Sequence, residues 1–246
     1  MRDQAHAGAA RGFQPAHPIY GTPGIEFIPH RAGLHTRAGN ALPRSGELMI
    51  WRFGASWDYL SHEEAAIWLS RQEMARLRLY RNPSFAKRYA IARVSLRRIL
   101  ADALGKPPQS LAIADDPHGQ PVLHEPDCAM PLSIRIAFAG IWITLGMSAD
   151  AFGLETLMPG AARVSAERNL ASARAACASQ LLAQPVDCVE TLCTQRIGAM
   201  SLLRDDDTDN AFKVIDLPMP GNISAAVATP LGTSTIHAYG WLNRGF

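Results

Sequence analysis

The sequence lacks the short motifs that mark the common nucleotide-binding and hydrolase folds. It contains no G-x-x-x-x-G-K-[ST] loop, no G-x-G-x-x-G fingerprint and no G-x-S-x-G elbow. These motifs cradle phosphates on backbone N–H groups or expose a nucleophilic serine. A triad can be imagined from His118, His124, Ser133 and Asp150, but the missing elbow argues against serine hydrolase chemistry.

Cysteines are few, and none of them forms a C-x-x-C pair. The four are Cys128, Cys177, Cys188 and Cys193. Zinc sites and redox motifs need closer pairs, so we expect reduced thiols in a cytoplasmic protein. Long apolar runs are also absent, since none approaches the roughly 18 residues of a membrane-spanning helix. The N-terminus has no apolar core of a secretory signal, so we expect no membrane association.

The chain has little excess charge of either sign. Its net charge is +2 over 246 residues, with 48% hydrophobic and 19% charged residues. So small an excess gives no reason to expect a nucleic-acid partner. The composition is that of an ordinary globular protein of one large or two small domains.

Three regions follow from the pattern along the chain. Residues 1–46 are rich in Gly, Pro, His and Arg, and we expect a mobile N-terminal extension, pinned locally by Ile19, Tyr20, Phe27 and Ile28. Residues 47–130 and 131–246 each read as strands and helices followed by strands. The predicted fold class is therefore α+β, with two α/β halves divided near residue 130.

The first half opens with a strand over Glu47–Phe53. Ser61 and Glu64 form a capping box that begins a helix, and a second helix begins at Ser70. A basic helical region then runs to about Leu104, interrupted at Asn82–Ser84 and stopped by Gly105. A hairpin turn is expected over residues 115–119.

The second half opens on a strand over Ile141–Leu145, followed by a turn and a second apolar segment over Phe152–Leu154. Apolar spacing and capping residues then predict two helices, Ser165–Ala183 and Asp187–Leu203. Three closing strands are expected: Phe212–Leu217, Ile223–Ala228 and Thr235–Trp241.

Two charge clusters have open interpretations. Nine Arg and Lys residues lie between Arg71 and Arg98, where they could bind phosphate groups or form a solvated helix face. The acidic run Asp205–Asp209 could hold a hard cation, but it lacks the glycine and distal glutamate of a calcium loop, which favours a solvated turn.

Several ordered motifs between about residues 48 and 228 resemble the two-lobed 4′-phosphopantetheinyl transferases. They are the strand MIWRF at Met49–Phe53, the helical pattern LSxxExARxRxY at Leu69–Tyr80, and RYxxARxxLRxIL at Arg88–Leu100. A D-x-x-G-x-P step at Asp116–Pro121 and a closing strand ending at Ala228 complete the series.

The resemblance implies a pseudo-twofold pair of similar α/β halves with coenzyme A and Mg²⁺ in the cleft between them. The family reaction moves phosphopantetheine from coenzyme A to a serine of an apo acyl or peptidyl carrier protein. By this resemblance Arg76 and Arg88 are the surviving phosphate-binding candidates, and Glu155 is the surviving metal ligand.

The family's phosphate and metal motifs are mostly replaced. Phe138 stands at the position of a phosphate-binding histidine in Ala137–Gly140, where the family has Ser-His-Ser-Gly. In Gly153–Leu157, Glu155 replaces the first metal-binding aspartate and Leu157 the second acidic residue. Mg²⁺ requires near-octahedral oxygen ligands, so this exchange weakens the expected metal site.

The third motif of the resemblance, W-x-x-K-E-x-x-x-K, corresponds to Cys193–Ser201. Ile197 replaces its glutamate and Ser201 its last lysine, while Arg196 keeps the charge. Gln120 stands where the family has a lysine before the proline. We therefore expect a catalytically impaired family member that binds a carrier protein. The alternative is an active transferase with an atypical Mg²⁺ site on Glu155 and, conceivably, Asp150.

Overall fold

A computed structural model describes residues 17–34, 42–57, 61–124, 131–159, 165–190, 192–205 and 210–242. It confirms the α+β class: helices and three sheets are combined in these residues. None of the helices in the described ranges is long and apolar enough to cross a membrane. Cys128 and residues 206–209 of the acidic run lie outside the described residues.

The first sheet joins strands from both ends of the chain. Its order is β1-β12-β2-β6-β5, with bounds β1 (Glu26–His30), β12 (Thr235–Tyr239), β2 (Glu47–Gly54), β6 (Trp142–Ser148) and β5 (Ser133–Ala139). β1, β12 and β2 are parallel neighbours, and β6 is antiparallel to β2 and β5. Six consecutive residues of β2 are buried, as expected for a central strand covered on both faces, and five of the six are apolar; the sixth is Arg52.

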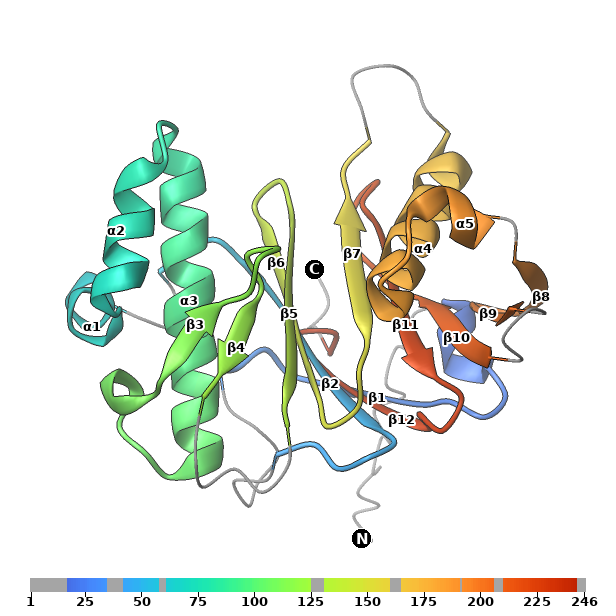
Figure 1. Cartoon of the computed structure of the whole chain (residues 1–246), viewed down its shortest axis with the longest axis horizontal. Helices are drawn as coiled ribbons and strands as arrows, with labels where there is room; N and C mark the ends of the chain where they lie inside the picture. The colour runs from blue at the N-terminus through green and yellow to red at the C-terminus, as the bar shows by residue number, and fades with distance from the viewer. Residues whose placement is uncertain are drawn as a thin grey trace, which may run out of the picture.

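Three helices cover one face of this sheet (Figure 1): α1 (His62–Trp68), α2 (Arg71–Leu79) and α3 (Pro83–Leu104). The predicted capping box at Ser61 is confirmed, and Ser70 forms a second one with Glu73. α3 begins after the cap Asn82 and ends at Gly105, whose φ of 64° suits glycine. The short η2 (Pro108–Ser110) and the hairpin of β3 (Ile113–Asp115) and β4 (Pro121–Leu123) follow.

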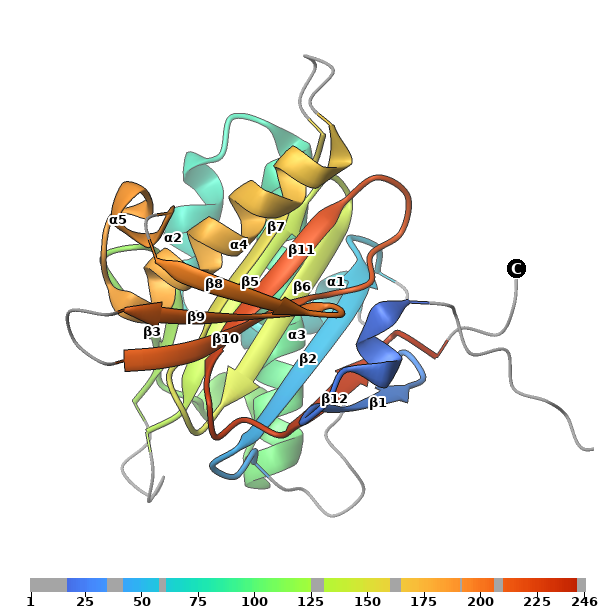
Figure 2. The same cartoon turned by 90° about the vertical axis from the view of Figure 1, so that its right-hand side faces the viewer.

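The second sheet is antiparallel throughout, in the order β7-β11-β10-β9-β8. Its strands are β7 (Gly153–Leu157), β11 (Ser224–Pro230), β10 (Asn210–Asp216), β9 (Met200–Asp205) and β8 (Cys193–Ile197). The helix α4 (Ala166–Leu182) packs on its outer face, followed by the short α5 (Val186–Glu190) (Figures 1 and 2).

Three apolar clusters lie between four layers. The first joins α3 to the first sheet, through residues such as Leu96 and Leu145. The second joins the two sheets, with Ile50 from β2 and Val227 from β11. The third joins α4 to the second sheet. The order of layers is therefore helices, sheet, sheet, helix.

The predicted helix over Asp187–Leu203 is wrong. Only α5 is helical, and the chain then forms the β8–β9 hairpin, seen face-on in Figure 2. Gly198 lies at the hairpin turn with φ of 62°, a left-handed conformation that interrupts a right-handed helix.

Part of the expected N-terminal extension is packed against the domain. η1 (Pro18–Gly21) places Ile19 in a fully buried position, and β1 adds a strand to the first sheet through its pairing with β12. Phe27 of β1 is also buried, in the cluster between the sheets. The predicted local contacts of Ile19 and Phe27 are thus present within a regular element.

The sheets divide the chain differently from the predicted halves. β5, β6 and β12 come from beyond residue 130, yet they belong to the same sheet as β2. The change from one sheet to the other comes instead at the turn between Ser148 and Gly153.

Candidate functional site

The site that the family resemblance predicts would lie around Phe138 on β5, near the N-terminus of α3. The guanidinium of Arg88 lies over the Phe138 ring, 4.8 Å from its centroid, and Arg88 Nη1 donates to the Gly140 carbonyl at 2.7 Å. Burial lowers the pKa of Arg88, opposed by Tyr80. Arg88 therefore ties the start of α3 to the β5–β6 turn, and Phe138 forms the platform beneath it.

Arg76 has a different partner and lies at a different place. Its Nη1 donates to Asp115 Oδ2 on β3, and its guanidinium lies 5.6 Å from the Tyr89 ring centroid. The contacts of Arg76 join α2 to the small hairpin, whereas those of Arg88 face the β5–β6 turn. The two predicted phosphate ligands thus have separate structural partners.

Glu155 faces α4 from β7. Gln180 Nε2 donates to its Oε2 at 3.3 Å, and the Thr156 N–H donates to its Oε1 at 2.9 Å. Burial raises the pKa of Glu155, with the Thr156 N–H acting in the opposite sense. Burial thus makes the ionised carboxylate, the form that binds a metal, less favourable than it is in water.

The second acidic candidate does not join Glu155. Asp150 lies in the turn before β7, where it accepts from Ser45 Oγ at 3.0 Å and from the Gly46 N–H at 2.7 Å. Within the described ranges no three His, Cys, Asp or Glu side chains are grouped as metal ligands. Glu155 and Asp150 thus have separate partners and do not form one carboxylate pair.

The remaining replaced positions pack into the fold. Leu157 lies against the cluster beneath α4, and Ile197 lies against the cluster between the sheets. Ser201 is buried on β9, directly across the hairpin from Arg196. Ile197 and Ser201 therefore belong to two strands, not to one helix.

Gln120 also has a structural partner. Its side chain bonds the backbone of Ile136 in both senses: Oε1 accepts from the N–H at 2.8 Å and Nε2 donates to the carbonyl at 3.3 Å. These two hydrogen bonds hold the turn before β4 against β5. The Gln120 side chain thereby satisfies the backbone N–H and carbonyl of Ile136, as a neighbouring strand would.

The basic region does not form one solvated face. Arg93 and Arg97 are 2% and 1% exposed and both bind Glu73, which excludes them from any surface contact. The exposed cations of the region are Arg71, Arg78, Arg81, Lys87 and Arg98.

Four apolar side chains are exposed near three of these cations, and we call this set the apolar–basic edge. It consists of Leu79, Phe85, Ile141 and Met158 with Arg78, Arg81, Lys87 and Arg88. The four apolar residues are 80%, 49%, 68% and 54% exposed. They lie at the last residue of α2, the start of α3, the β5–β6 turn and the residue after β7, segments at the upper end of the molecule in Figures 1 and 2.

Contacts connect these segments. Arg88 lies over Phe85 at 5.0 Å and donates to Gly140, and the Met158 side chain lies against Gly140 from the other side. The sequence analysis did not identify the apolar members. Large apolar residues at helix ends and turns, such as Leu79 and Ile141, could have indicated an exposed apolar patch.

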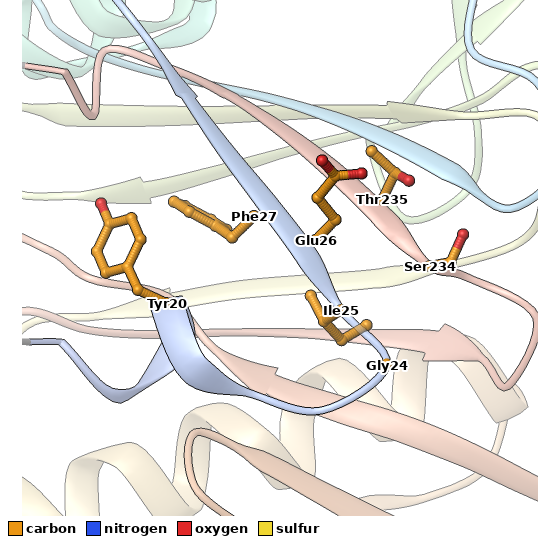
Figure 3. Close-up of a pocket in the computed structure, with 7 residues that line it drawn as sticks. All are labelled: Tyr20, Gly24, Ile25, Glu26, Phe27, Ser234 and Thr235. Atoms are coloured by element: carbon orange, nitrogen blue, oxygen red, sulfur yellow. The ribbon is translucent and has the colours of Figure 1, made fainter.

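A separate shallow pocket of about 530 Å³ lies between η1, β1 and the residues before β12 (Figure 3). Tyr20 and Phe27 meet edge to face there at 5.4 Å, and Glu26 supplies its one carboxylate. Its other polar side chains are the hydroxyls of Tyr20, Ser234 and Thr235.

Comparison with known proteins adds no relative. No protein-family model matches the chain, and no curated protein matches it significantly. The likeness to the transferases therefore depends on the sequence motifs alone.

Proposed function

We propose that the chain is a non-catalytic protein of the 4′-phosphopantetheinyl transferase superfamily that binds an acyl or peptidyl carrier protein as an accessory factor. The observation that carries the non-catalytic part is the surroundings of Glu155. It bonds Gln180 and a backbone N–H, and burial raises its pKa above the ordinary 4.5. Transfer of a phosphopantetheine group needs a cation on the pyrophosphate and a base for the serine hydroxyl.

The residues that replace the family's other site residues support the same proposal. Phe138 lies beneath Arg88, Leu157 packs under α4, and Gln120 bonds β5. None of these side chains can act as a general base or neutralise the negative charge of a bound phosphate group. The two outer helix layers around two sheets are compatible with the two-lobed fold that the motifs imply.

The apolar–basic edge supports the carrier-binding part. Its cations suit an acidic surface, and its four exposed apolar side chains could be buried by a partner. We therefore assign it a partner that presents acidic residues around an apolar helix face, as expected of a carrier protein under this proposal.

Binding of an apo carrier protein to the full chain tests this assignment by calorimetry. We expect R78E/R81E to weaken binding roughly tenfold, because opposite charges at an interface rim become like charges. Phe85→Ala should weaken it by a similar factor through lost apolar burial. Added salt should reduce affinity for the unmodified chain and have less effect on the charge-reversed variant.

Arg168→Glu provides the matched control, because Arg168 is exposed on α4 in the other part of the molecule. It should bind as the unmodified chain does. Absence of binding to several carriers, or equal binding by R78E/R81E, would contradict the proposed surface.

A further inference from the structure

A second pocket, which shares no lining residue with the apolar–basic edge, has the features of a small-molecule site. It encloses about 490 Å³ between η1, the first half of α4, the end of β8 and the β10–β11 loop. We call it the Arg174 pocket. Its volume lies within the range of ordinary ligand sites.

A buried carboxylate at its wall holds two guanidinium groups. Arg174 Nε and Nη2 each donate to Asp216 at 2.7 Å, and Arg196 Nη2 donates to the same carboxylate at 3.3 Å. The Asp216 side chain is 7% exposed, that of Arg174 is 17% exposed and that of Arg196 is 49% exposed. The two guanidiniums thus share one buried carboxylate, and Glu167 is the second acidic residue of the lining.

Both arginines keep donors for a ligand. The Nη1 group of Arg174 and that of Arg196 make no hydrogen bond to any described residue, while their other nitrogens bind Asp216 or the Gly198 carbonyl. Because Asp216 already fixes the two side chains, little side-chain entropy would be lost when an anion binds.

His17 adds a neutral donor at the edge of the same pocket. Its Nδ1 accepts from the Ile19 N–H at 3.3 Å, so the ring proton lies on Nε2. Burial lowers the pKa of His17, opposed by the charge of Asp216. The ring can therefore donate a hydrogen bond without adding a second charge.

The donors and charges of the lining select the ligand class. The two Nη1 donors can bind a single carboxylate, and the exposed Glu167 in the lining disfavours a dianion. Leu170, Met219 and Ile223 are large apolar residues of the same lining. We propose that the Arg174 pocket binds an organic monocarboxylate with a short apolar body, its carboxylate on Arg174 and Arg196.

Calorimetric titration of the full chain with octanoate tests this, with 1-octanol and inorganic phosphate as companion probes. We expect one octanoate site, and at least tenfold weaker binding of octanol, since a charge-assisted contact is stronger than a neutral one. Phosphate should bind more weakly than octanoate, because it lacks the apolar body.

Two variants locate the site. Arg196→Gln removes a half-exposed cation and leaves the Arg174–Asp216 pair intact, and it should weaken octanoate binding roughly tenfold. Leu170→Trp should fill the pocket and abolish binding. Arg168→Gln, an exposed position on the same helix, is the matched control and should bind octanoate normally.

Circular dichroism and the thermal midpoint of each variant establish that it is folded. No octanoate binding, equal affinity for octanol, tighter binding of phosphate, or unchanged affinity in folded Arg196→Gln and Leu170→Trp would each overturn the proposal. The site shares no residue with the apolar–basic edge, so failure of carrier binding leaves it unaffected.

Discussion

Glu73→Gln is expected to lower the free energy of unfolding by about 3–5 kcal/mol, because it removes the anion from a buried ion cluster. Glu73 is 3% exposed, and its carboxylate accepts hydrogen bonds from Arg93 Nε at 2.8 Å and from Arg97 Nε at 2.9 Å. The substitution leaves less negative charge to balance the two buried guanidinium groups. Urea unfolding measures the loss.

Glu63→Gln is the matched control, since Glu63 is exposed in the first turn of α1. Its effect should stay within about 0.5 kcal/mol. A second control separates the cap from the cluster: Ser70→Ala removes only the hydroxyl side of the capping box and should cost about 1 kcal/mol. Equal stability of Glu73→Gln and the unmodified chain would contradict the importance of the cluster.

Acid should diminish the difference between Glu73→Gln and the unmodified chain. Burial alone would raise the pKa of Glu73, but Arg93, the Ser70 N–H and Arg97 outweigh it and hold the pKa below its ordinary 4.5. A lowered folded-state pKa gives stabilisation that is complete above the unfolded pKa and is lost as pH falls through the folded one. The gap should therefore be full at pH 7 and shrink below about pH 4.5.

Gly153→Ala is expected to destabilise the fold by about 3 kcal/mol through a clash between β7 and α4. A Cβ at Gly153 would lie 1.8 Å from the Cys177 carbonyl oxygen and 2.7 Å from its carbonyl carbon. Both atoms belong to the backbone of α4, so the whole helix would have to move away from the sheet. Thermal or urea unfolding measures the effect.

Gly232→Ala serves as its control, because a Cβ there would meet no atom within 4 Å. That variant should keep its stability. A fully stable Gly153→Ala would mean that α4 does not pack as closely on β7 as the structure describes.

Local signals predicted the first helices well. The boxes at Ser61 and Ser70 and the stop at Gly105 depend on hydrogen bonds between residues close in sequence, so a short stretch contains the whole cause. The turn at Asp116 is similar, since its carboxylate accepts from the His118 and Gln120 N–H groups.

The helix predicted over Asp187–Leu203 failed because its apolar spacing has two structural solutions. Residues four apart share a face in a helix and also in a strand, since four is an even number. The left-handed conformation of Gly198 favours the hairpin, because it interrupts a right-handed helix. β1 could not be predicted either, because its pairing with β12 joins Glu26 to Thr235 across most of the chain.

The candidate site was predictable only in part. The family resemblance singled out Arg88 and Phe138 separately, and the structure places the Arg88 guanidinium over the Phe138 ring. It could not tell which arginines of the basic region are buried, although Arg93 and Arg97 follow the buried Tyr89 at a spacing of four on α3. The ion cluster around Asp216 joins α4, β8 and β10, so no local pattern indicates it.

The intact mass of an apo carrier protein, after incubation with the chain, coenzyme A and Mg²⁺, tests the central claim most directly. An authentic phosphopantetheinyl transferase serves as the positive control, and circular dichroism establishes that the chain is folded. The proposal predicts no mass increase in any carrier that the chain binds. A phosphopantetheine adduct that disappears in Glu155→Ala would contradict it and make Glu155 part of an active, atypical metal site.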